Sequence, residues 1–124
     1  MIREAFAVLP AKDLERARGW YADKFQIEPV AEAGGGLIYS FGAGSLYLYP
    51  SPNAGTAKST AAGFVVDDLT AAMAALRSRG VRFEEYAMDD GPSTVDGVAT
   101  NPSAKSAWFT DSEGNIVNLI EVAQ

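Results

Sequence analysis

The 124-residue sequence contains neither cysteine nor histidine. Without cysteine there can be no disulfide, no thiolate metal site and no thiol catalysis. The lack of histidine as well removes the Ser–His and Cys–His arrangements of nucleophilic catalysis. A zinc centre also loses its commonest ligands, because zinc needs three or four nitrogen, sulfur or carboxylate donors.

Basic residues are few, with 10 lysines and arginines against 16 aspartates and glutamates, a net charge of −6 and a pI near 4.5. Binding to nucleic acid or to an anionic membrane needs a basic surface, so neither is expected as a partner. The charge favours a cationic partner, although solubility alone also explains it. No apolar run is long enough to span a bilayer and no basic-then-apolar leader follows Met1, so the sequence predicts a cytoplasmic protein.

What the sequence does contain is an internal repeat. Asp13-Leu14-Glu15-Arg16-Ala17 and Asp68-Leu69-Thr70-Ala71-Ala72 lie 55 positions apart, since 68 − 13 = 55, and each follows a short apolar run. A hydrophobic content of 48% and a charged content of 21% are values typical of a globular domain. We therefore expect one domain over residues 1–124, with module one at 1–52, a linker at 53–60 and module two at 61–124.

In module one, an apolar strand over Ala5–Leu9 is predicted to stop at Pro10, which cannot donate a ladder hydrogen bond. Asp13 is expected to cap a helix. The buried stripe of this helix is predicted from helical spacing and comprises Leu14, Ala17, Tyr21 and Phe25, whereas Arg16, Arg18 and Lys24 are expected to face solvent. Gly34–Gly36 is interpreted as a turn, because it has neither the Lys-Ser/Thr nor the helix start of a phosphate loop. A hairpin follows, over residues 37–41 and 45–49.

In module two, the pattern predicts a strand over 63–66, a helix capped by Asp67 or Asp68 and closed by Gly80, and strands over 81–86, 106–110 and 116–122. Asp111–Asn115 has the composition of a turn, so Asp111 and Glu113 are interpreted as turn carboxylates. The segment 87–105 has no counterpart in module one. It is expected to be mobile and to flank the mouth of a cavity, and its Thr94–Ala99 part has enough β-branched residues to pair with a strand.

Three stretches resemble the vicinal oxygen chelate superfamily, which includes glyoxalase I, extradiol dioxygenases and bleomycin-resistance proteins. They are Val8–Ala17 followed by Trp20-Tyr21, then Phe64–Leu69, and finally Trp108–Asn115. The resemblance covers essentially the whole chain. It implies an α+β fold in which two βαβββ modules form a half-open mixed sheet around a concave cavity, and it also implies a homodimer.

Enzymes of this superfamily usually hold a divalent metal through four side chains, and the matched motifs place those positions at Phe6, Tyr47, Ala61 and Asn118. None of the four is a good ligand, since they offer no imidazole and no carboxylate. The resemblance therefore points to the branch that lacks the metal ligands, and we expect no metal and no cofactor.

Strand alternation predicts which side chains would line the cavity. The expected ligand-binding residues are Phe6, Val8, Tyr47, Tyr49, Trp108 and Asn118. They make an aromatic, mostly uncharged lining suited to a small organic molecule that is aromatic or cationic. For most of these aromatic residues, packing in the core or in a dimer is the alternative explanation.

Two functions are compatible with these residues. The preferred one is a metal-independent small-molecule-binding protein of the bleomycin-resistance type, which sequesters its ligand. The alternative is a metal-independent isomerase, lyase or cyclase in which Tyr47, Tyr49 or Glu4 transfers a proton. No catalytic residue is assigned, and Glu121 is expected to face away from the cavity because its parity on the last strand is opposite to that of Asn118.

Overall fold

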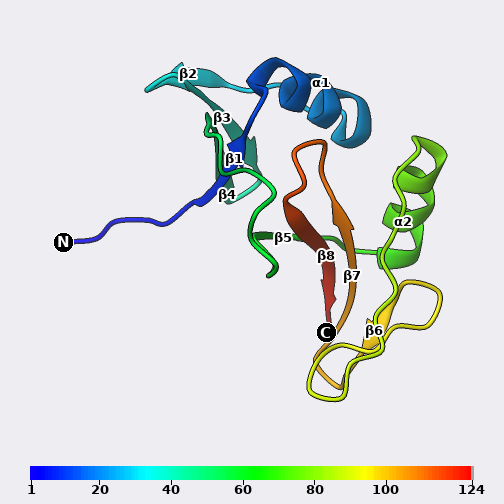
Figure 1. Cartoon of the computed structure of the whole chain (residues 1–124). Helices are drawn as coiled ribbons and strands as arrows, with labels where there is room; N and C mark the ends of the chain where they lie inside the picture. Colours follow the sequence, from blue (N-terminus) through cyan, green and yellow to red (C-terminus); the bar gives the residue numbers. More distant parts are fainter. Residues whose placement is uncertain (124) are drawn as a thin grey trace.

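The computed structural model describes residues 1–123, which form two helices and eight strands in the order βαβββ–βαβββ. Module one contains β1 (Ala7–Ala11), α1 (Leu14–Phe25), β2 (Ala31–Ala33), β3 (Gly36–Phe41) and β4 (Gly44–Pro50). Module two contains β5 (Ala62–Val65), α2 (Leu69–Ser78), β6 (Ala99–Thr100), β7 (Ala104–Thr110) and β8 (Ile116–Val122). The expected α+β fold of two βαβββ modules is confirmed (Figure 1).

The strands form two open four-stranded sheets with the same topology, β1-β4-β3-β2 and β5-β8-β7-β6. In each sheet the first strand of the module pairs in parallel with the last, and the other pairs are antiparallel. The register places Val8 opposite Tyr47 in module one and Gly63 opposite Asn118 in module two. The repeat visible in the sequence is therefore a repeat of strand order and of register.

Both helices begin at an aspartate. The Asp13 carboxylate accepts from the Arg16 N–H at 3.0 Å, and the Asp68 carboxylate accepts from the Ala71 N–H at 3.0 Å. Of the two caps that the sequence allowed for α2, Asp68 is the one used. An aspartate here satisfies an orphan amide and complements the positive end of the helix dipole.

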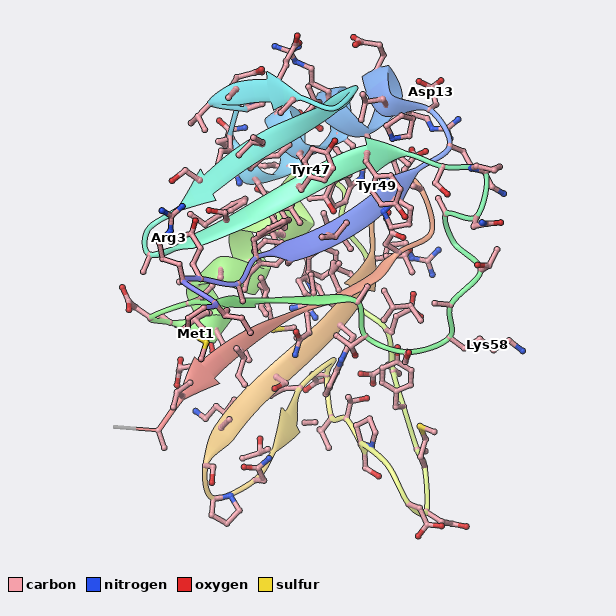
Figure 2. All side chains as sticks on the ribbon, turned by 90° about the vertical axis from the view of Figure 1, so that its left-hand side faces the viewer. Met1, Arg3, Asp13, Tyr47, Tyr49 and Lys58 are labelled. Atoms are coloured by element: carbon pink, nitrogen blue, oxygen red, sulfur yellow. The ribbon has the colours of Figure 1, made fainter. Side chains whose placement is uncertain are left out.

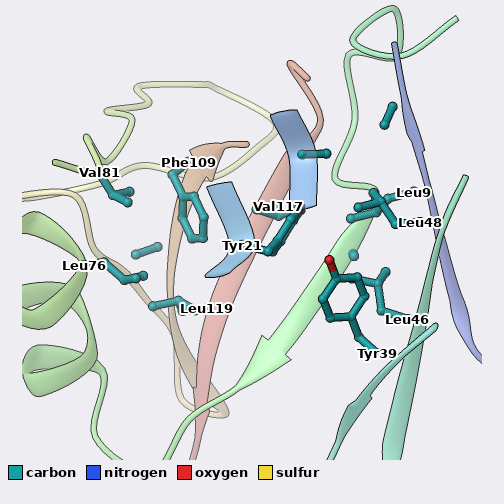
Figure 3. Packing of buried hydrophobic residues seen from close by; sticks show 14 of the residues in the cluster. Leu9, Tyr21, Tyr39, Leu46, Leu48, Leu76, Val81, Phe109, Val117 and Leu119 are labelled. Carbon is teal, nitrogen blue, oxygen red and sulfur yellow. The ribbon is translucent and has the colours of Figure 1, made fainter. Parts of the chain in front are cut away.

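The core joins the two modules, because α1 packs against strands of both. Tyr21 of α1 lies between the buried residues of the two sheets, as Figure 3 shows. Phe25 lies 5.0 Å from Phe64 and 6.0 Å from Phe109 between ring centroids, both in edge-to-face geometry. Such pairs add to the free energy of apolar burial. The predicted stripe is confirmed, with Ala17 and Tyr21 fully buried and the other two members half-buried.

Lys24 and Arg79 occupy equivalent positions in the repeat and bind each other's backbone. The Lys24 Nζ donates to the Arg79 carbonyl, and the Arg79 Nη1 donates to the Lys24 carbonyl at 2.8 Å. Their separation of 55 residues is the period of the repeat. This reciprocal pair ties the carboxyl end of α1 to that of α2. Lys24 was expected to face solvent, and this expectation is wrong because its side chain donates to the Arg79 carbonyl at the end of α2.

Two strand predictions need correction. β1 does not stop at Pro10, since Pro10 and Ala11 remain in register with Tyr49 and Pro50 of β4. Proline is tolerated there because β1 is an edge strand, so the missing N–H is not needed on the free side. Residues 81–86 do not form a strand; a single bond from the Glu84 N–H to the Trp108 carbonyl, 2.8 Å long, holds them beside β7.

The segment 87–105 contains more structure than the sequence suggested. Ala87 bridges to Ser93, Val95 bridges to Val98, and Ala99 of β6 pairs with Ser106 of β7. The pairing expected of Thr94–Ala99 is thus present in part. Figure 1 shows this segment looping beyond one end of the second sheet. Neither helix within residues 1–123 is long and apolar enough to cross a membrane.

Candidate ligand-binding site

Tyr47 and Tyr49 lie on the face of β4 that is turned away from the helix (Figure 2). Leu46 and Leu48, which alternate with them, are buried on the helix side. The two tyrosine rings are nearly parallel, with 6.1 Å between centroids and an interplanar angle of 3°. Strand alternation thus creates a stacked aromatic surface on the open face.

The Tyr47 ring is fixed by the β2–β3 hairpin beside it. Its hydroxyl donates to the Ala33 carbonyl at 2.7 Å and lies 3.2 Å from the Gly34 carbonyl. A Cβ on Gly36 would lie 2.7 Å from the Tyr47 Cζ, and one on Gly34 would lie 3.0 Å from its hydroxyl. The glycine run is a turn, as expected, and it also leaves the space that the tyrosine ring occupies.

A cavity of about 410 Å³ opens beside this ring. Its size falls within the usual range for small-molecule sites. All of its lining residues come from module one, and they are Glu4, Phe6, Ala33, Gly34, Ile38, Ser45, Leu46 and Tyr47. Glu4 is the charged member of this otherwise mostly apolar lining.

Two predicted residues on β1 and the segment before it are strongly exposed. Phe6 is 58% exposed and lines this cavity, and Val8 is 45% exposed and lies opposite Tyr47 in the register. The chain before Ala7 extends away from the sheets (Figure 1). Four of the predicted residues, Phe6, Val8, Tyr47 and Tyr49, therefore share one neighbourhood.

The other two, Trp108 and Asn118, face each other across β7 and β8 in module two. Trp108 lines a second cavity, of about 440 Å³, whose lining residues all come from module two. Its neighbour Phe109 is fully buried against Trp20 and Phe25 of α1, so the predicted register of this strand is confirmed. The Asn118 amide lies over Gly63, where an added Cβ would approach its Oδ1 to 2.7 Å. Of the six residues, Phe6 and Tyr47 line the module-one cavity and Trp108 lines the module-two cavity, whereas Val8, Tyr49 and Asn118 line neither.

The four positions at which the resemblance would place metal ligands carry neither imidazole nor carboxylate. Phe6 and Tyr47 line the module-one cavity, Asn118 faces Trp108, and Ala61 donates its N–H to the Ile116 carbonyl. In the part of the chain that the structure describes, no three His, Cys, Asp or Glu side chains are grouped to hold an ion.

Asp111 has the turn role expected of it, since its Oδ1 accepts from the N–H groups of Glu113 and Asn115 at 2.9 and 3.0 Å, but the turn also makes contacts with module one. The Asp111 Oδ2 accepts from the Tyr21 hydroxyl at 2.7 Å, and the Asn115 Nδ2 donates to the Pro10 carbonyl at 2.8 Å. Asp111, Glu113 and Asn115 are all buried. The turn between β7 and β8 therefore fastens module two to β1 and α1 of module one, and it has a structural role.

Glu113 is the centre of this attachment. Its carboxylate accepts from the Arg16 Nε at 2.8 Å, the Arg16 Nη2 at 2.9 Å, the Asp13 N–H at 2.9 Å and the Ser112 hydroxyl at 2.8 Å. Burial alone would raise the pKa of Glu113, but these hydrogen bonds and the guanidinium charge outweigh it and lower the pKa to about 2. Arg16, which was expected to face only solvent, is thus an ion-pair partner of a buried carboxylate.

Glu121 has the equivalent role for α2, the helix of module two. It faces away from Asn118, as expected, and its Oε1 accepts from the Leu69 N–H at 2.8 Å at the start of α2. No local signal in the sequence marks Glu113 or Glu121 as helix-anchoring residues, because each lies 52 or more positions from its backbone partner.

Paired βαβββ modules with open sheet faces define the class of fold. A family model described as the glyoxalase/bleomycin resistance protein/dioxygenase superfamily matches residues 5–119. The chain therefore belongs to this superfamily. A search of curated proteins found no match.

Solved structures share the fold at low sequence identity. TnmS3, an antibiotic binding protein from Streptomyces sp. CB03234, is 24% identical with a TM-score of 0.72, and 99% of each chain is covered. A bleomycin-binding protein complexed with bleomycin is 18% identical with a TM-score of 0.68, covering 97% of this chain and 98% of its own. Lactoylglutathione lyase from Agrobacterium tumefaciens is 20% identical with a TM-score of 0.67, covering 96% and 92%. The similar structures thus include binding proteins and an enzyme, so the fold does not decide between the two.

Proposed function

We propose that the protein is a metal-independent small-molecule-binding protein that holds a planar aromatic compound, cationic by preference, in the module-one cavity. The observation that carries this proposal is the stacked Tyr47–Tyr49 pair beside a cavity of about 410 Å³. Fixed aromatic rings on an open face offer a flat surface for stacking a planar ligand.

The charge of the cavity supports the preference for a cation. Glu4 is the charged residue of the lining, and Tyr47 presents an aromatic ring close to it. A carboxylate and an aromatic ring together favour a positively charged group. Antibiotic-binding proteins among the similar structures agree with a sequestering role.

Isothermal titration with a planar cationic dye and a neutral planar analogue tests this proposal. Replacing Tyr47 with serine is expected to weaken dye binding by about tenfold or more, because a stacking surface is lost. Glu4→Gln should weaken the binding of the cationic dye but leave the binding of the neutral analogue unchanged. Met88→Ser, which changes an exposed apolar residue of module two, serves as the control. Equal affinity in all variants, or no binding of either compound, would contradict the proposal.

Metal independence is part of the same proposal, and the donor set supports it, since Phe6, Tyr47, Ala61 and Asn118 offer neither imidazole nor carboxylate. Dye affinity is expected to be unchanged after treatment with a chelator and after addition of zinc, nickel or manganese. A chelator-sensitive affinity restored by one of these ions would show that a metal takes part.

We further propose that the protein forms a homodimer through the exposed apolar side chains of its two contacting edge strands. Val8 on β1 is 45% exposed and Val65 on β5 is 73% exposed, the two strands are in contact, and Phe6, which directly precedes β1, is exposed as well. Clustered exposed apolar residues mark interaction surfaces more often than single ones do.

Sedimentation equilibrium checks the dimer. The wild-type protein is expected to sediment as a dimer. Val8→Glu and Val65→Glu should each shift the equilibrium toward monomer, because each would place an unpaired charge in the buried dimer interface. Val30→Glu, at a 66% exposed position away from both edge strands, is the matched control. A monomeric wild-type protein at its highest soluble concentration would contradict this proposal.

A further inference from the structure

The module-two cavity differs in chemistry from the module-one cavity. Its lining carries no charged side chain, and beside Trp108 it contains the polar residues Ser93, Thr100, Asn101 and Ser106. Ser106 and Trp108 lie two residues apart on β7 and so share the open face of the second sheet. Ser93 and Asn101 come from the segment that precedes β7, and Asn101 directly follows β6, the strand that pairs with β7.

The polar groups of this cavity are available to a ligand. The Asn101 Oδ1 accepts from the N–H groups of Ser103 and Ala104 at 2.8 and 2.9 Å, which fixes the amide and leaves its Nδ2 as a donor. Within the described residues, the structure gives no hydrogen bond to the hydroxyls of Ser93 and Ser106. Each hydroxyl can donate one hydrogen bond and accept two.

The indole of Trp108 is held in place from two directions. Its Nε1 donates to the Thr60 hydroxyl at 3.0 Å, and its ring meets Tyr86 edge-to-face with centroids 5.6 Å apart. Because the indole donor is already used, Trp108 offers a ligand its ring surface. A fixed apolar ring is therefore surrounded by uncharged donors and acceptors.

This combination selects a ligand that is neutral, carries several hydroxyls and has an apolar face. A charged ligand would lose its hydration without gaining a counter-charge, and a purely apolar ligand would leave the hydroxyls and the amide unpaired. A pyranose ring meets all three requirements, because its axial C–H groups form an apolar face and its hydroxyls point outward. We propose that the module-two cavity is a binding site for a neutral sugar ring stacked on Trp108. This proposal does not rest on the function proposed for the module-one cavity.

The test uses the whole protein labelled with nitrogen-15 and titrated with the methyl glycosides of glucose, galactose and mannose. Trp108 and Trp20 are the two tryptophans of the chain, so the Trp108 indole N–H gives one of two such resonances. We expect at least one glycoside to shift it saturably with a Kd of about 1–10 mM, the range of a weak small ligand. Tetramethylammonium and inorganic phosphate, as charged probes, are expected to leave it unchanged.

Two mild variants localise the site. Ser106→Ala and Ser93→Ala each remove one hydroxyl without adding bulk, and each is expected to weaken glycoside binding about fivefold or more. Thr70→Val, which removes an exposed hydroxyl from α2, should leave the Kd unchanged. The proposal is overturned if no glycoside gives a saturable shift, if the charged probes shift Trp108 instead, or if both serine variants bind as the wild type does. Unchanged amide spectra away from the substitution confirm that each variant is folded.

Discussion

Replacing Glu113 with glutamine is expected to lower the free energy of unfolding at neutral pH by about 3 kcal/mol. The carboxylate is fully buried, and it accepts hydrogen bonds from the Arg16 guanidinium and from the Asp13 N–H. A glutamine retains one acceptor oxygen and turns an N–H₂ group toward these donors. The Arg16 charge then loses its partner, and one or more donors are left unpaired.

The same carboxylate gives the protein a defined acid sensitivity. The pKa of Glu113 is about 2 in the folded protein and 4.5 ordinarily, the lowering coming from Arg16, Asp13 and Ser112 against the effect of burial. A lowered folded-state pKa stabilises the protein fully above the ordinary value, and this contribution is lost as the pH falls from about 4.5 to about 2. Urea unfolding at several pH values should show a steeper acid decline for wild type than for Glu113→Gln across this window.

Glu15→Gln is the matched control, because Glu15 is an exposed residue in the first turn of the same helix. It is expected to change stability by less than about 0.5 kcal/mol. If the two variants lose stability equally, or if the difference between Glu113→Gln and wild type is constant from pH 7 to pH 2, the role assigned to Glu113 is incorrect.

The parts of the fold that depend on local pattern could be predicted from the sequence. The stripe of α1 and the opposite orientations of Trp108 and Phe109 follow from periodicity, which is a property of neighbouring residues. The Asp13 cap likewise depends on groups three positions away. Each of these predictions is confirmed by the structure.

Features that depend on contacts between the modules could not be predicted in this way. Glu113 looks like any turn residue until α1 is packed beside it, 97 or more positions away in the chain. Residues 81–86 have the composition of a strand, but they make one ladder-type bond to β7 where a strand makes several. That Phe6 and Tyr47 line one cavity and Trp108 another depends on how the two sheets are placed, which alternation along a single strand does not specify.

Replacing Gly36 with alanine is expected to displace the Tyr47 ring and to lower the free energy of unfolding by about 2 kcal/mol. The added Cβ would lie 2.6 Å from the Leu48 carbonyl oxygen and 2.7 Å from the Tyr47 Cζ and hydroxyl. β3 lies between β4 and β2, so the backbone cannot move aside without breaking ladder bonds on both sides. The tyrosine ring can yield, but the contact with the Leu48 carbonyl remains, so both the ring and the neighbouring backbone must shift.

Gly44→Ala is the matched control, since it adds a Cβ to the neighbouring strand with its nearest neighbour at 3.6 Å, an ordinary contact. Thermal unfolding and titration with the planar cationic dye measure both consequences. Gly36→Ala should lose stability and bind the dye about tenfold more weakly, whereas Gly44→Ala should keep both properties. In a double-mutant cycle with Tyr47→Ala, the loss of unfolding free energy caused by Gly36→Ala should be about 1 kcal/mol smaller, because the ring that the added methyl group contacts is absent. If the stability losses of the two substitutions are additive, Gly36 is needed only for the close approach of the backbone and does not position Tyr47 for a ligand.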